Sequence, residues 1–94
     1  MTEFKDLFEK NLKNLELYVP VVARVHGGTH PEFHDVKSVY DTMVEKLKNN
    51  EENYDEEFVK LREITSNYDV PGDTCETYEA VYQMLGEMDK VYHA

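Results

Sequence analysis

The apolar residues of this chain fall into four segments of helical spacing, and this pattern is the strongest constraint on its fold. Within each segment they return every three or four positions, which is the period of one helix face. No segment alternates with the period of two that a half-buried strand shows. Glycine, proline or polar residues separate the segments near residues 27–29, 48–53 and 69–73. The sequence therefore predicts an all-α fold, an antiparallel four-helix bundle with short connections.

Turn and capping residues predict where each helix begins. The first helix is expected from Thr2 to His26, bent or broken at Pro20, which has no amide donor. The second is expected to start at Thr29 or His30, the third near Asn53 and the fourth at Asp73. Thr29, Asn53 and Asp73 each precede a glutamate by three positions, which is the spacing of a capping box. The stripes predicted to be buried are Phe4, Phe8, Leu12, Leu15, Val19 and Val22; Val36, Tyr40, Met43 and Leu47; Phe58, Leu61 and Ile64 or Thr65; and Cys75, Tyr78, Tyr82, Leu85 and Met88.

Length, charge and cysteine content limit the domain number, the partners and the location that the sequence predicts. The 94 residues predict one domain over 1–94 with a modest core. The chain is acidic, with a net charge of −10, which argues against nucleic acid and membrane-surface partners. No apolar run is long enough to span a bilayer, and no signal peptide is expected. A single cysteine favours a reducing compartment, so a cytoplasmic location is expected.

The histidines are the first candidate metal ligands. His30 and His34 stand four residues apart, and on one helix face that spacing can chelate Zn²⁺, Ni²⁺ or Cu²⁺. His26 lies beyond the glycine pair, off that face. Two imidazoles bind weakly without a carboxylate such as Glu32, so an exposed pair beside a helix start is the alternative interpretation.

Cys75 is a candidate redox thiol. In the first turn of the fourth helix, free backbone amides would stabilise its thiolate. Its place on the apolar stripe favours the alternative of a buried, unreactive packing residue.

Two stretches of the chain resemble one known family, the di-iron proteins that repair iron-sulfur clusters and carry a hemerythrin-like domain. The matching residues are Val25-His26-Gly27-Gly28-Thr29-His30-Pro31-Glu32-Phe33, then Leu61-Arg62-Glu63-Ile64-Thr65-Ser66-Asn67-Tyr68, followed by Pro71, Cys75, Thr77-Tyr78, Tyr82, Leu85 and His93. The resemblance implies a hemerythrin-like bundle. It also implies a set of iron ligands spread over all four helices.

Most positions of that ligand set hold other residues here. His26 matches the family's Val-His ligand, and His93 falls near the histidine-rich end of the fourth helix. The ligand of the first helix falls near Phe4-Lys5. The ligands of the second helix fall within residues 47–52 and those of the third near Asn50-Glu51, and none of these positions is a histidine. The resemblance therefore implies a shortened, ligand-depleted member without an intact di-iron centre. Iron binding would need another chain to complete the site.

Two functions follow from these observations. One is an accessory role in iron physiology or in the response to nitrosative or oxidative stress, related to iron-sulfur cluster repair. The alternative is a small helical protein-interaction module without metal chemistry. The sequence has no nucleophile elbow, phosphate loop or HExxH motif, so no enzymatic activity is expected. A protein partner or self-association as a dimer is expected in either case.

Overall fold

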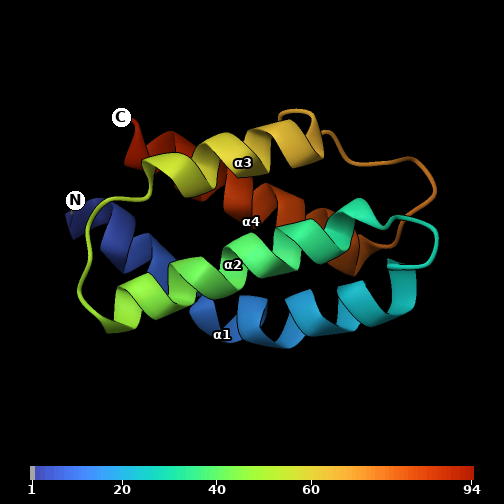
Figure 1. The fold of residues 1–94 in the computed structure, drawn as a ribbon, viewed down its shortest axis with the longest axis horizontal. Helices are drawn as coiled ribbons and strands as arrows, with labels where there is room; N and C mark the ends of the chain where they lie inside the picture. The colour runs from blue at the N-terminus through green and yellow to red at the C-terminus, as the bar shows by residue number, and fades with distance from the viewer. Residues whose placement is uncertain (1) are drawn as a thin grey trace.

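The computed structural model describes residues 2–94, which form four α-helices joined by three connections. The helices are α1 (Thr2–His26), α2 (Glu32–Lys48), α3 (Asp55–Thr65) and α4 (Glu76–Tyr92). Each runs antiparallel to the one before it, and both termini lie at the same end of the bundle (Figure 1). The described residues span 35 × 22 × 19 Å. The predicted antiparallel four-helix bundle is confirmed, and the three breaks fall where glycine, proline and polar residues indicated.

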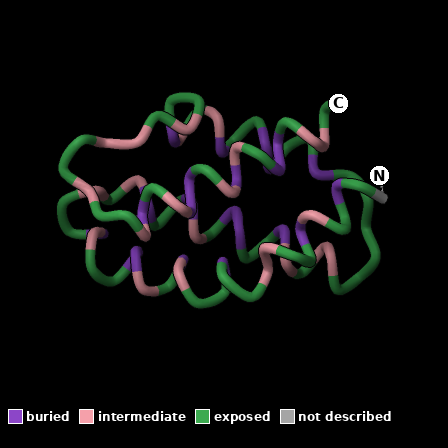
Figure 2. Tube along the Cα trace, turned by 180° about the vertical axis from the view of Figure 1, so that it is seen from behind, coloured by how far each residue is buried: buried purple, intermediate pink, exposed green. Residues whose placement is uncertain are grey.

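The buried residues form one core between the helices, and they recur along the inner side of each one (Figure 2). The largest fully buried side chains are Tyr54, Tyr78, Tyr82, Phe8, Phe33, Phe58, Leu15, Met43, Leu61, Leu85, Met88 and Val19. The predicted stripes supply most of this core, whereas Leu12, Leu47 and Ile64 are only partly buried. Aromatic rings fill much of the interior, so the bundle depends on their packing. None of the helices described in residues 2–94 is long and apolar enough to cross a lipid bilayer.

The first helix continues through Pro20 without a break. Its 25 residues include this proline on an exposed face. Pro20 removes one backbone hydrogen bond, but Leu15, Val19 and Val22 on either side of it are completely buried. The packing of these side chains holds the helix together, because tertiary contacts supply most helical stability in proteins. The alternative of a helix broken at Pro20 is therefore wrong.

The predicted helix caps are also wrong. The second, third and fourth helices each begin two or three residues later than expected, and none has a side-chain hydrogen bond from its N-cap residue. Asp73, predicted to cap the fourth helix, bonds to His30 instead. Asn53 Oδ1 accepts a hydrogen bond from the Asp55 amide at 3.0 Å, which is a local turn rather than a capping box. The side chains of Asp73 and Asn53 therefore bond to a tertiary partner and within a local turn, and do not form capping boxes.

The third helix ends in a left-handed turn. Ser66, Asn67 and Tyr68 have φ values of 54°, 62° and 65°, a conformation that bulky residues seldom adopt. Two hydrogen bonds hold Tyr68 there: its amide donates to Thr65 Oγ1 at 2.7 Å, and its hydroxyl donates to Asp89 at 2.6 Å. Its ring lies against Gly86 of the fourth helix, where an added Cβ would stand 3.3 Å from it. The turn therefore ties α3 to α4.

Candidate functional site

Most of the predicted site residues gather at one end of the bundle, which we call the loop end. It consists of the α1–α2 connection (27–31), the α3–α4 connection (66–75) and the helix termini beside them (Figure 1). The last residue of α1, the α1–α2 connection and the residue before α4 meet here. His26, His30 and Cys75 are thereby brought together from distant parts of the sequence.

His26 and Cys75 form a contact between α1 and α4. The Nε2 atom of His26 lies 3.3 Å from the Sγ atom of Cys75. Cys75 is exposed, and His26 is partly exposed. The rings of His26 and Tyr78 form a T-shaped contact with their centroids 5.4 Å apart. The prediction of a buried Cys75 is wrong, because α4 starts at Glu76. Cys75 is instead the extended N-cap residue, with ψ of 172°.

His30 links the two connections through both of its ring nitrogens. Nδ1 lies 3.1 Å from Glu32 Oε2, and Nε2 lies 2.9 Å from Asp73 Oδ1. Burial lowers the pKa of His30, but the hydrogen bonds to Glu32 and Asp73 outweigh it and raise that pKa above 6.5. When the ring is protonated, both nitrogens donate hydrogen bonds to carboxylates, and we call this arrangement the His30 clasp. In this state the ring has no lone pair for a metal.

His34 does not share a helix face with His30. The second helix begins at Glu32, so His30 lies before it and the predicted chelating pair of the second helix is not formed. His34 is exposed, and its ring covers Gly27: a Cβ added there would stand 2.2 Å from His34 Nε2 and 2.3 Å from the Ala23 carbonyl. Gly27 is therefore required for close packing.

His93 lies at the opposite end, next to Asp89. Its Nδ1 lies 2.7 Å from Asp89 Oδ1, and Arg62 Nη2 lies 3.1 Å from its Nε2. Asp89, which is 6% exposed, also accepts hydrogen bonds from Arg62 Nε and the Tyr68 hydroxyl. Burial raises the pKa of Asp89, but these hydrogen bonds outweigh it and hold that pKa below 3.8. This network is a structural ion pair that joins α3 to α4.

The candidate metal ligands of residues 2–94 do not converge in the middle of the bundle. A di-iron centre requires imidazoles and carboxylates that project into the middle of the bundle. Buried Tyr82, Leu85 and Met43 occupy that interior instead. His26 ends α1 and His93 follows α4, and these two helix ends lie at opposite ends of the bundle. Among residues 2–94, no three His, Cys, Asp or Glu side chains converge closely enough to hold a metal ion. Within residues 2–94, the candidate ligands His26, His30, His34 and His93 therefore do not meet at one point.

The sequence missed Asp73 as the partner of His30 and the Asp89 network. Asp73 is 43 positions from His30 in the sequence, so no spacing within one helix predicts this contact. The pair Asp89 and His93 at i and i+4 was a usable signal, since that spacing places both on one helix face.

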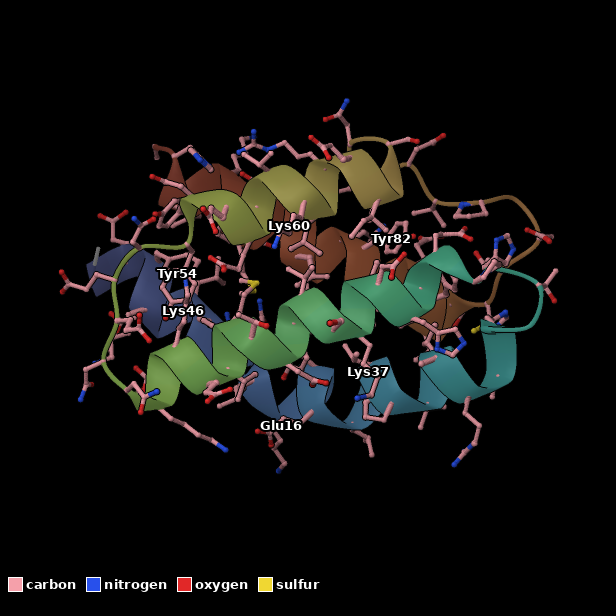
Figure 3. All side chains as sticks on the ribbon, viewed as in Figure 1. Glu16, Lys37, Lys46, Tyr54, Lys60 and Tyr82 are labelled. Atoms are coloured by element: carbon pink, nitrogen blue, oxygen red, sulfur yellow. The ribbon has the colours of Figure 1, made fainter. Side chains whose placement is uncertain are left out.

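One groove lies away from these groups. It has a volume of about 490 Å³ at the end opposite the loop end, where its walls include Phe4, Leu47 and Tyr54. Lys46 and Tyr54 lie close together at this end (Figure 3), with Lys46 Nζ 6.0 Å from the centroid of the Tyr54 ring. No cysteine or histidine lines this groove, so it does not contribute to the loop-end chemistry.

The fold is an antiparallel four-helix bundle, and the chain is similar to curated proteins named for iron-sulfur cluster repair. The chain is 25% identical to the iron-sulfur cluster repair protein ScdA of Staphylococcus haemolyticus, over 98% of this chain and 57% of that protein. It is 23% identical to ScdA from two strains of Staphylococcus epidermidis, over 96% of this chain and 55% of those proteins. The resemblance stated from the sequence motifs is confirmed. No family model matches the chain, and no solved structure matches it.

The chain is shorter than the matching part of these relatives. It spans a little over half of their length. The alignments cover 126 and 127 residues, more than the 94 of this chain, so the relatives have internal residues without a counterpart here. This agrees with the shortening predicted from the spacing of the motifs.

Proposed function

We propose that this protein acts as an accessory factor in iron-sulfur cluster repair, in the response to nitrosative or oxidative stress, without an intramolecular di-iron centre. The similarity to ScdA proteins over almost the whole chain is the observation that carries the role. The arrangement of the histidines supports the proposed absence of an intramolecular di-iron centre. His30 is engaged by two carboxylates and His93 by Asp89, at opposite ends of a 35 Å bundle.

In this role the chain acts together with a partner protein. An accessory factor of this kind binds a damaged cluster protein or a full-length repair protein, or it shares a metal site with a second chain. Because metal affinity depends on the number of converging ligands, a single copy holds iron weakly. A partner that adds ligands at the loop end would change that.

A deletion strain tests the role. After exposure to nitric oxide, recovery of a [4Fe–4S] dehydratase is followed in extracts of the wild-type, deleted and complemented strains. We expect slower recovery in the deleted strain and restoration by the intact gene. Equal recovery in all three strains would contradict the repair role and favour the interaction module without metal chemistry.

Metal analysis tests the absence of a di-iron centre. We expect the chain, purified without oxygen, to contain less than one iron per chain and to lack the absorption of an oxo-bridged di-iron centre. Two irons per chain retained through dialysis against a chelator would overturn this part of the proposal. That outcome would leave the repair role standing.

A further inference from the structure

We propose that Cys75 and His26 form half of a zinc site that two copies of this chain complete, with one Zn²⁺ held by two thiolates and two imidazoles. The inference concerns one site and does not require cluster repair activity. A chain that binds zinc as described but fails the deletion test would keep the site and lose the proposed role.

The separation of the two donor atoms fits one metal ion. Zinc bonds of about 2.3 Å to sulfur and 2.0–2.1 Å to nitrogen, at a tetrahedral angle, place the two donors about 3.6 Å apart. Cys75 Sγ and His26 Nε2 are 3.3 Å apart. A small rotation of either side chain therefore accommodates the ion, and the thiol proton leaves to solvent as the zinc–sulfur bond forms.

The backbone positions of both donors are fixed by helix ends. His26 is the last residue of α1, and Cys75 is the N-cap residue of α4. Tyr78, which is completely buried, packs against the His26 ring in a T-shaped contact. The pair is therefore organised before metal arrives, which reduces the entropy lost on binding.

One chain supplies no further ligand at this place. His30 is occupied by Glu32 and Asp73, and His34 lies on Gly27. Within the described residues no group of three metal-binding side chains exists. Two donors leave a tetrahedral zinc ion half coordinated, so a single chain binds it weakly.

A second copy supplies the same two donors. A two-fold interface duplicates every residue, so the pair becomes a set of two sulfurs and two nitrogens, which zinc favours. The exposed position of Cys75 leaves the pair open to a partner, and neighbouring Val25, 62% exposed, adds apolar surface beside it. Each chain has a net charge of −10, so two copies repel one another without metal. The zinc site itself is neutral, with two thiolates and one Zn²⁺, so the coordination bonds rather than a change in net charge hold the two copies together.

The test uses the full chain with Zn²⁺ and Co²⁺ as probes, in a non-thiol reductant. We expect one metal per two chains by elemental analysis and a metal-dependent dimer by light scattering. Cobalt should give the absorption of a tetrahedral ion with a thiolate charge-transfer band. One zinc per monomer, no binding, or a dimer that reductant dissociates would each overturn the proposal.

Variants distinguish zinc bound at this site from cations bound elsewhere on the acidic chain. Cys75→Ser and His26→Gln should each weaken zinc binding by more than about 100-fold and abolish the dimer. The matched control His34→Gln, at the same end and exposed, should bind as the unmodified chain does. Circular dichroism checks that all three variants fold. Retention of zinc binding and dimerisation in folded Cys75→Ser would overturn the proposal.

Discussion

The two ends of the bundle differ in how their side chains are used. At the aromatic end, Phe4, Tyr54, Phe58 and Tyr92 pack ring against ring, with centroids 5.0–6.0 Å apart. At the loop end, polar side chains meet at the surface, and Cys75 and His26 are accessible. Buried rings such as Phe33 and Tyr78 stabilise the loop end as well, but the aromatic end has rings at its centre where the loop end also has an accessible thiol and imidazole. The following predictions test this division, from the largest expected effect to the smallest.

Phe58→Ala should have the largest effect, because Phe58 is completely buried and touches the rings of Phe4 and Tyr92. Removal of a buried phenylalanine costs about 3–5 kcal/mol. Denaturant unfolding measures this loss. Val59→Ala, on the exposed side of the same helix, is the control and should stay within about 0.5 kcal/mol. A loss below about 1 kcal/mol for Phe58→Ala would mean that the aromatic end does not stabilise the fold.

Asp89→Asn should have the next largest effect, about 1–3 kcal/mol near neutral pH, through weaker hydrogen bonds to Arg62 and Tyr68. The Arg62 side chain is 37% exposed, so solvent screens part of this interaction. Because the pKa of Asp89 is lowered, its contribution is present above 3.8 and is lost as the pH falls through the folded value.

Unfolding curves at several pH values measure this dependence. The two proteins should become equally stable under acid conditions. Asp41→Asn, in an exposed pair with Lys37, is the control and should change little. A difference that persists unchanged into strong acid would show that the Asp89 charge is not what matters.

His30→Gln should have a smaller effect of opposite pH dependence. A raised pKa contributes stability below the unfolded value of 6.5, and the contribution is lost as the pH rises through the folded value. Melting temperatures of the variant and the unmodified protein should therefore differ under mildly acidic conditions and converge under alkaline ones. His34→Gln should show no such trend. Equal melting temperatures at every pH would mean that the His30 clasp does not hold the two connections.

Cys75→Ser should have the smallest effect on the free energy of unfolding, within about 0.5 kcal/mol without metal, since Cys75 is exposed. The same substitution is expected to abolish the zinc-dependent dimer. A large loss of stability without metal would place Cys75 among the residues that hold the fold, contrary to the division between the two ends.

The helices could be predicted from the sequence, but their starting points and the site could not. Stripes such as Tyr78, Tyr82 and Leu85 have helical spacing, and burial of that face determines the helix. Asp73 and Cys75 were misplaced because a capping pattern is local, whereas their partners His30 and His26 are more than forty residues away. Contacts at that separation depend on how the helices pack, which spacing alone does not encode.

The left-handed turn after α3 also affects how α3 aligns along α4. Only one alignment of α3 against α4 brings the Tyr68 hydroxyl and Arg62 to the buried carboxylate of Asp89. Any other alignment leaves that carboxylate buried without partners, which is costly. The unfavourable backbone at residues 66–68 is thus tolerated because it gives the bundle a unique register.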